Sequence, residues 1–288
     1  MQKYIDSFRE MISLRGLTDH TIRSYTTYLT AYLEFLASQT DKKPEEATWQ
    51  DMRDAMRFIQ QQRSLSDRTM NAMISQLRFF TIYVLHKPWD DSQLPKRRFD
   101  TYLPFVPSKD EVWTFISSLS DLKQKAMIVL LYSSGLRIGE VRHLKCADIE
   151  HSKMRIFIRS SKNRSQRYAI LSDYAWNVIL AYWRNHGKPT DWLFPQQRDI
   201  SRPINHSFLP RAIREHLAVL GWDKPFNCHC FRHAFGTHLY ENGTDLLTIK
   251  NLLGHKSLIS TTVYVHLAHN SFHGVTSPFD ILMEERNV

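Results

Sequence analysis

The chain has 288 residues, of which 42% are hydrophobic, and its 38 Lys and Arg against 29 Asp and Glu give a formal charge of +9. This composition excludes wholesale disorder, and the length favours one or two domains. No stretch reaches the ~20 apolar residues of a membrane span, the first ten residues do not form a secretory signal, and three cysteines are too few for a disulfide scaffold. We therefore expect a protein of the reducing cytoplasm.

Residues 1–87 predict a domain made of helices alone. Apolar residues recur at spacings of three and four in four stretches, near residues 4–12, 22–36, 49–62 and 70–85. Thr18 is a suitable N-cap for the second helix, and Ser66 or Asp67 for the fourth. Four helices joined by short polar turns predict a small bundle.

Residues 88–107 predict a linker, because they contain four prolines and few periodic apolar positions. A second domain, residues 108–288, then begins with a capping box formed by Ser108 and Glu111.

The second domain is predicted to be mainly α-helical with one small antiparallel β-sheet. Alternating residues predict strands at 154–160 and 167–171, with 161–166 as the tip of the hairpin between them. The remaining pattern is helical, near residues 123–134, 136–144, 172–184, 205–220, 229–241, 245–253 and 258–267.

Most of the positive charge lies in the second part of the chain, since residues 1–88 have a net charge of +2 and residues 89–288 a net charge of +7. Basic clusters bind polyanions because each contact with a phosphate releases counterions. We therefore expect contacts with nucleic acid from the clustered residues Arg159, Arg164, Arg167, Lys96, Arg97 and Arg98. A solvated basic face is the alternative interpretation.

Two patterns in the basic region suggest phosphate chemistry. After the helix break at Gly135, Arg137 begins a new helix, where it could clamp an anion, and Glu140 lies three residues further on the same face. Lys162 lies at the hairpin tip, where a lysine can donate a proton to a leaving oxygen. The alternative for Arg137 and Glu140 is an ordinary ion pair at a helix start. The alternative for Lys162 is a surface lysine with no catalytic role.

A third pattern is Cys228-His229-Cys230-Phe231-Arg232-His233. His229 and Arg232 share a helix face and could bind two oxygens of one phosphate. Zinc is a competing interpretation, because Cys228, His229, Cys230 and His233 are all possible ligands. The expectation is no metal, because no second metal-binding pair accompanies this one.

The fourth pattern is Leu253-Gly254-His255-Lys256-Ser257, followed by Thr261-Thr262 and Tyr264. A tyrosine hydroxyl, with a pKa of about 10, is a poor nucleophile unless cations surround it. Taken by itself, a tyrosine at position 264 would more often be a core packing residue.

Together, these patterns resemble the tyrosine recombinase (phage integrase) family, and the bacterial Xer-type recombinases in particular. The resemblance covers the whole chain. It implies an N-terminal SAM-like core-binding domain and a catalytic domain with the DNA breaking–rejoining fold. Cys230 and Gly139 depart from common family residues but occupy no catalytic position, and residues 274–280 are similar to the tail of integron integrases.

The resemblance implies a role for each motif residue. Tyr264 would attack a DNA phosphodiester to form a 3′-phosphotyrosine, with the phosphate held by Arg137, Arg232 and His255. Lys162 would protonate the 5′-oxygen, His229 would assist proton transfer, and Glu140 would support Arg137. No metal ion, ATP or other cofactor is expected.

The implied partners are a double-stranded recombination site and further copies of the chain. An apolar C-terminal helix near residues 270–288 would dock on a neighbouring protomer to build a tetramer, although it could instead pack on its own domain. The protein would be cytoplasmic and nucleoid-associated, acting in integration, excision, transposition or chromosome resolution. The alternatives are a type IB-like topoisomerase and a non-catalytic DNA-binding regulator.

Overall fold

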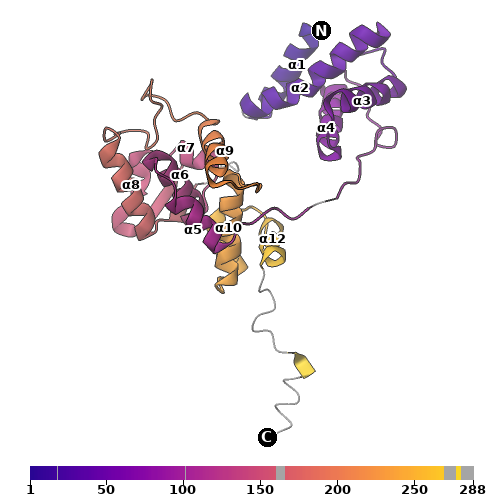
Figure 1. The fold of residues 1–288 in the computed structure, drawn as a ribbon. Coiled ribbons are helices and arrows are strands. Elements are labelled where there is room, and N and C mark those ends of the chain that lie inside the picture. The colour runs from indigo at the N-terminus through magenta and orange to yellow at the C-terminus, as the bar shows by residue number, and fades with distance from the viewer. Residues whose placement is uncertain (18, 101, 160–165, 269–276, 280–288) are drawn as a thin grey trace. The chain divides into compact units, whose positions relative to one another are not determined.

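The computed structural model describes residues 1–17, 19–100, 102–159, 166–268 and 277–279 (Figure 1). The chain divides into two compact units, Met1–Thr101 and Tyr102–Val288, each with its own hydrophobic core. Within those described ranges, no helix combines the length and the apolar character needed to cross a membrane.

The first unit is the helical bundle that the sequence predicts. Its elements are α1 (Gln2–Leu14), α2 (Asp19–Phe35) with a π-helical extension (Leu36–Thr40), α3 (Trp49–Arg63) and α4 (Asp67–Tyr83). Phe8, Leu29 and Phe80 are fully buried where these helices meet. Ser66, rather than Asp67, caps α4 by accepting a hydrogen bond from the backbone of Thr69, whereas the cap predicted at Thr18 lies outside the described residues.

The first unit extends beyond the boundary expected at residue 87. Leu94 is buried in its core, and the Asn71 amide exchanges two hydrogen bonds of 2.8 Å with the backbone of Arg97. The first part of the proline-rich segment 88–107 therefore packs on the bundle, and the division between the units comes at residues 101 and 102.

The second unit is mainly helical and carries one three-stranded antiparallel sheet among its described residues. Its helices are α5 (Lys109–Ser117), α6 (Leu122–Ser133), α7 (Ile138–Arg142), α8 (Asp173–Asn185), α9 (Phe208–Leu220), α10 (Cys228–Glu241), α11 (Leu246–Leu253) and α12 (Ile259–Leu267). Its strands are β1 (Ile149–Glu150), β2 (Arg155–Ile158) and β3 (Arg167–Ile170), with short 3₁₀ turns at Cys146–Asp148 and His151–Lys153.

The sheet follows the order β1-β2-β3, and Ile158 pairs with Arg167 at the end of the β2–β3 hairpin that adjoins the connecting segment. The predicted capping box of Ser108 and Glu111 is confirmed at the start of α5. The two predicted strands are confirmed in slightly shorter form, whereas β1 was not predicted, because two residues show no alternation.

Helix α6 is the centre of the second unit. It is apolar on nearly all sides, its residues 126–131 are buried, and it packs against α8 and α10. Phe115 of α5 completes this core, stacking on Phe226 and meeting Phe231 edge-on, with ring centroids 5.4 Å apart in both cases. This packing fixes α10, the helix that carries Arg232.

Phe115→Ala should lower the free energy of unfolding of the second unit by about 3–5 kcal/mol, because it empties a fully buried aromatic site. Trp113→Ala is the matched control on the same helix, since Trp113 is 63% exposed; its effect should stay within about 1 kcal/mol. Guanidinium unfolding followed by circular dichroism measures both. Equal losses in the two variants would contradict this description of the core.

Candidate active site

Arg137 stands where α6 gives way to α7, and a glycine makes this turn possible. Gly135 has a φ of +60°, and a Cβ at this position would lie 2.4 Å from the ring of Phe235. Arg137 is the N-cap residue of α7, and its side chain is 18% exposed. The break therefore leaves the guanidinium partly accessible at the start of the new helix.

Glu140 is a buried carboxylate that joins several arginines. Its Oε1 accepts hydrogen bonds of 2.9 Å from Nη1 of both Arg137 and Arg167, and its Oε2 accepts from the Arg137 backbone and from Arg167 Nη2. Arg232 Nη1 lies 3.9 Å from Oε2. Burial acts to raise the pKa of Glu140, but the interactions with Arg167, Arg137 and Arg232 outweigh it and lower the pKa.

Arg232 is held deep in the unit by backbone carbonyls. It is 4% exposed and donates to the carbonyl of Gly135 and, at 2.6 Å, to the carbonyl of Leu253. Burial, with a contribution from the like charge of Arg137, lowers its pKa to about 9. The guanidinium therefore remains charged at neutral pH, and it joins α10 to the ends of α6 and α11.

Tyr264 of α12 packs directly on α10. Its ring stacks on His255 at 6.3 Å with an interplanar angle of 13°, and the ring of His233 lies 6.1 Å away. A Cβ at Gly236 would lie 2.6 Å from Tyr264 Cζ, so only glycine leaves room for the ring in this position. The side chain is 1% exposed, and burial raises its pKa, with Arg232 and Arg137 acting in the opposite direction.

The histidines around Tyr264 are held neutral. Burial and nearby positive charge lower the pKa values of His233 and His255 to about 4. His255 Nδ1 shares a hydrogen bond of 2.9 Å with Thr261 Oγ1, whereas the buried Nδ1 of His233 has no hydrogen-bond partner among the described residues. His229 is exposed in the first turn of α10.

The structure thus brings five of the six expected catalytic residues into one region of the second unit, and the sixth, Lys162, lies outside the described residues. Sequence reasoning missed the position of His233 beside Tyr264. The signal was present, because a residue four positions after His229 lies on the same helix face.

The two cysteines of α10 have a packing role. Both Cys228 and Cys230 are buried, and burial raises the pKa of each thiol to about 12. Within the part of the chain that the structure describes, no group of three or more His, Cys, Asp or Glu side chains is arranged to hold a metal ion.

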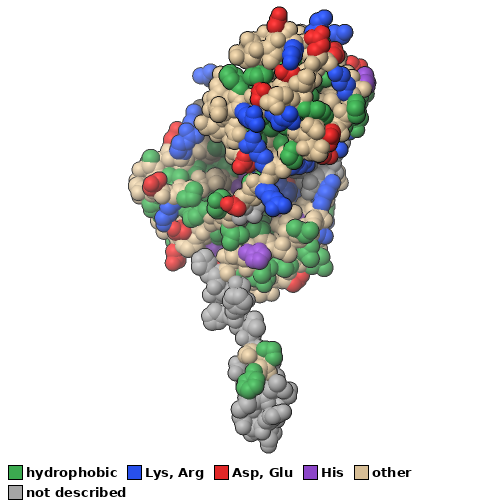
Figure 2. Space-filling model, turned by 90° about the vertical axis from the view of Figure 1, so that its right-hand side faces the viewer, with side chains coloured by type: hydrophobic (Ala, Val, Ile, Leu, Met, Phe, Trp, Pro, Cys, Tyr) green, Lys and Arg blue, Asp and Glu red, His purple; other side chains and the backbone are tan. Residues whose placement is uncertain are grey.

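The expected DNA-binding residues have different environments. Lys96 and Arg98 are exposed, but Arg97 forms an ion pair of 2.8 Å with Asp67. Arg167 is buried against Glu140, and Arg164 lies outside the described residues. On the face shown in Figure 2, acidic side chains are scattered among the Lys and Arg side chains of each unit.

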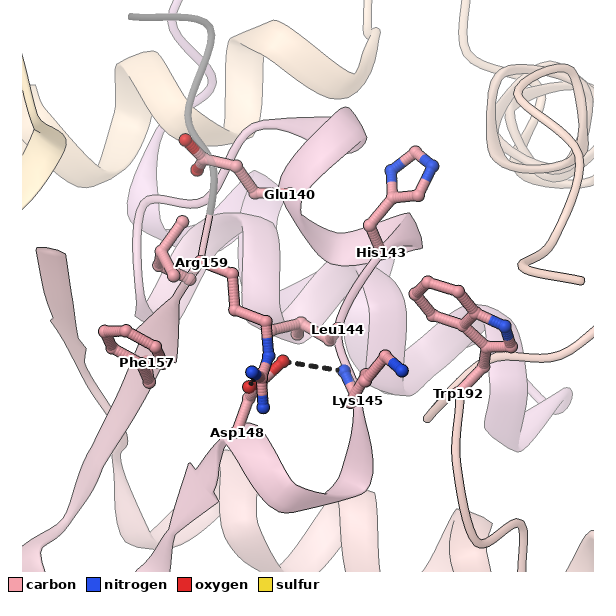
Figure 3. Close-up of a pocket in the computed structure, with 9 residues that line it drawn as sticks. Glu140, His143, Leu144, Lys145, Asp148, Phe157, Arg159 and Trp192 are labelled. Atoms are coloured by element: carbon pink, nitrogen blue, oxygen red, sulfur yellow. Dashed lines mark hydrogen bonds and ion pairs between the residues drawn. The ribbon is translucent and has the colours of Figure 1, made fainter. Parts of the chain in front are cut away.

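Arg159 lies at a pocket of about 370 Å³ that Glu140 also lines (Figure 3). Its side chain is half exposed and pairs with the buried carboxylate of Asp148 at 2.6 Å. Lys145 and Trp192 line the other side of this pocket. A cation at this position can reach solvent next to the arginine cluster.

Residues 108–271 match the model of the phage integrase family, and residues 4–91 match that of its N-terminal SAM-like domain. The chain belongs to the phage integrase family. It is a tyrosine recombinase, a DNA strand transferase that acts at specific sites, as the Xer-type resemblance implied. The match with the SAM-like model also confirms the expected character of the first unit.

Relatives and solved structures agree with this membership. A putative integrase/recombinase of Sinorhizobium fredii is 32% identical, with 95% of this chain and 87% of the relative covered. The tyrosine recombinase XerA of Pyrococcus horikoshii is 29% identical, covering 90% and 87% of the two chains. A lambda integrase dimer bound to a core site has the same fold, with a TM-score of 0.71 at 16% identity, covering 96% of this chain and 98% of that one.

The stability of this phage integrase domain should fall in mild acid. Since His233 and His255 have pKa values of about 4 in the folded state, below that of a free histidine, the unfolded chain binds more protons as the pH drops through this window. The free energy of unfolding should therefore decrease between about pH 6.5 and pH 4. Guanidinium titrations across this range measure the decrease.

His255→Gln should make the pH dependence shallower, whereas His206→Gln, at an exposed histidine of the same unit, should leave it unchanged. Identical dependence in all three proteins would show that His255 is not one of the groups responsible.

Proposed function

We propose that Tyr264 is the nucleophile with which this recombinase breaks and rejoins DNA. Its hydroxyl oxygen attacks the scissile phosphorus, a phosphorus–oxygen bond forms, and the bond to the 5′-oxygen breaks. The products are a 3′-phosphotyrosine and a free 5′-hydroxyl. Because one phosphoester replaces another, a 5′-hydroxyl of the partner strand can reverse the step without ATP.

The observation that carries this proposal is the placement of Tyr264 beside Arg232, His233 and His255 in a family of tyrosine recombinases. Arg137 and Arg232 would hydrogen-bond the non-bridging oxygens of the phosphate and stabilise the charge of the pentacoordinate transition state. Such a donor contributes about 3–4 kcal/mol when it is well placed. His255, neutral at pH 7, would donate a third hydrogen bond to the phosphate.

Two proton transfers complete the reaction. Lys162 would protonate the departing 5′-oxygen, and His229 would accept the proton of Tyr264 or position the phosphate. Since Tyr264 is 1% exposed, α12 has to shift before its hydroxyl can reach DNA. We propose that DNA binding causes this shift.

We propose double-stranded DNA as the substrate, with Arg159, Lys96 and Arg98 as phosphate contacts because they are exposed. Arg97, Arg164 and Lys162 belong to the same two basic clusters. Phosphate contacts would position the protein on the duplex, and base contacts would select the site.

Strand exchange needs two sites and four protomers, so we propose a tetramer joined through the C-terminal segment near residues 270–288. Most of that segment lies outside the described residues.

The same chemistry would integrate, excise or transpose a DNA element, or resolve joined chromosomes. We propose that the protein acts in the cytoplasm, at the nucleoid. A type IB-like topoisomerase would share the tyrosine chemistry without exchanging partners. The names of the relatives, integrase and tyrosine recombinase, favour recombination.

Tyr264→Phe should bind DNA but form no covalent product. A substrate nicked near the cleavage point traps the intermediate, because the short fragment carrying the 5′-hydroxyl diffuses away. Wild type should give a protein–DNA band that survives denaturing gel electrophoresis, and the variant should give none.

The same assay distinguishes the alternatives. If wild type binds DNA but yields no band, the chain is a DNA-binding regulator. If it relaxes any supercoiled plasmid without preference and joins no paired sites, it acts as a topoisomerase.

Lys162→Ala should cleave ordinary DNA at least about 100-fold more slowly, because a general acid contributes that much. A substrate with sulfur in place of the bridging 5′-oxygen needs no proton from the protein. Its cleavage by the variant should therefore approach the wild-type rate. Equal slowing on both substrates would contradict a general acid role for Lys162.

A further inference from the structure

Arg167 is the first residue of β3, and each of its three guanidinium nitrogens donates a hydrogen bond inside the protein. Nη1 and Nη2 bind the two oxygens of Glu140 side by side at 2.9 Å, and Nε donates to the carbonyl of Leu252 at 3.0 Å. The side chain is 8% exposed. This geometry differs from the phosphate contact expected from its place in the basic segment, because the paired donors that would bind a phosphate already bind a carboxylate.

The ion pair between Arg167 and Glu140 limits how many hydrogen bonds Glu140 can accept from Arg137. A carboxylate accepts about four hydrogen bonds, and Glu140 accepts two from Arg167 and two from Arg137, one of which comes from the Arg137 backbone. Glu140 thus takes only one guanidinium nitrogen of Arg137 and leaves the others for a ligand. Without Arg167, the freed oxygens could bind Arg137 on both sides and compete with the phosphate.

The position of Arg167 also depends on the end of α11. Gly254 has a φ of +64°, and a Cβ at this position would lie 2.8 Å from Arg167 Cδ and 3.1 Å from its Nε. The side chain of Arg167 therefore packs against the backbone of Gly254, the residue before His255. One side chain in this way joins β3, the end of α11 and the carboxylate below Arg137.

We propose that Arg167 is a positioning residue for strand cleavage: it holds Glu140 so that Arg137 and Arg232 face the scissile phosphate. It does so through a forked ion pair with Glu140 and a hydrogen bond to the end of α11. This role rests on the proposed function, because it is defined by the cleavage step that Tyr264 carries out.

The test compares Arg167→Lys with wild type, because lysine keeps the charge and the aliphatic stem but loses the fork. Single-turnover cleavage at saturating DNA should slow by about 100-fold, the effect of a small misplacement of catalytic groups. DNA affinity and its dependence on salt should not change. Arg155→Lys is the matched control, because Arg155 lies on the neighbouring strand and pairs with Glu150 at 2.8 Å, outside the site. It should cleave at the wild-type rate.

A pH profile separates positioning from general structural support. Arg167 helps to keep the pKa of Glu140 low, so its replacement should let Glu140 take up a proton and give the cleavage rate a new decline in acid. Wild type should lack this decline. Adding Glu140→Gln to Arg167→Lys should remove the decline, because no carboxyl remains to titrate.

Three outcomes would overturn the proposal. Arg167 is a phosphate contact if Arg167→Lys weakens DNA binding but cleaves normally at saturating DNA. In that case the slope of log affinity against log salt concentration should also fall by about one. If the variant cleaves normally with unchanged affinity, or slowly with no new pH dependence, Arg167 does not act through Glu140.

Wild-type protein separates this proposal from the function on which it rests. If wild type forms no covalent band, both fail; if wild type forms the band and Arg167→Lys equals it, only the positioning role fails. Should Arg167→Lys not fold by circular dichroism, Gly254→Ala provides the second test, because its methyl group would lie 2.8 Å from Arg167 Cδ and push against the stem without changing any charge. Since a φ of +64° also strains the backbone next to His255, the new decline in acid, and not the slower rate alone, identifies an effect through Glu140. It should reproduce the slow cleavage at unchanged DNA affinity, and normal cleavage by this variant would also overturn the proposal.

Discussion

The second unit is organised around one buried carboxylate among three guanidinium groups. Glu140 is 6% exposed, binds Arg137 and Arg167 directly, and lies 3.9 Å from Arg232. A single negative charge cannot neutralise three positive ones, so the cluster keeps an excess of positive charge in a region poor in water. Such a region attracts an anion strongly because solvent screens it little. The carboxylate keeps the arginines together, and the excess positive charge is what the proposed phosphate contact would use.

This constraint explains why the catalytic unit needs segments far apart in the sequence. Arg137 follows α6, Arg167 begins β3 and Arg232 lies on α10, and each is fixed by backbone carbonyls or by Glu140 rather than by another flexible side chain. The apolar helix α6 supplies the rigid support, because both α8 and α10 pack against it. Removing one arginine would leave the carboxylate buried and less well compensated, which costs more than the lost contact alone.

Much of the fold follows from local patterns in the sequence, whereas the site follows only in part. Helices such as α4 and α5 carry apolar periodicity and a side-chain cap, so their position could be predicted. The two-residue strand β1 and the packing of Leu94 on the first unit depend on distant partners that no local pattern encodes. Motifs identified Arg137 and Tyr264, but the partner of Arg167 is 27 residues away, and the contact requires a glycine at position 254.

The close contact between Tyr264 and Gly236 has a consequence for genome integrity. A recombinase meets far more ordinary duplex than target sites, and each encounter is an opportunity for accidental breakage. The ring of Tyr264 rests on the backbone of Gly236 and is 1% exposed, so the protein in this conformation presents no accessible Tyr264 hydroxyl to duplex DNA. With Tyr264 as the proposed nucleophile, this packing would limit accidental breakage, since α12 would have to move away from α10 before the hydroxyl could react.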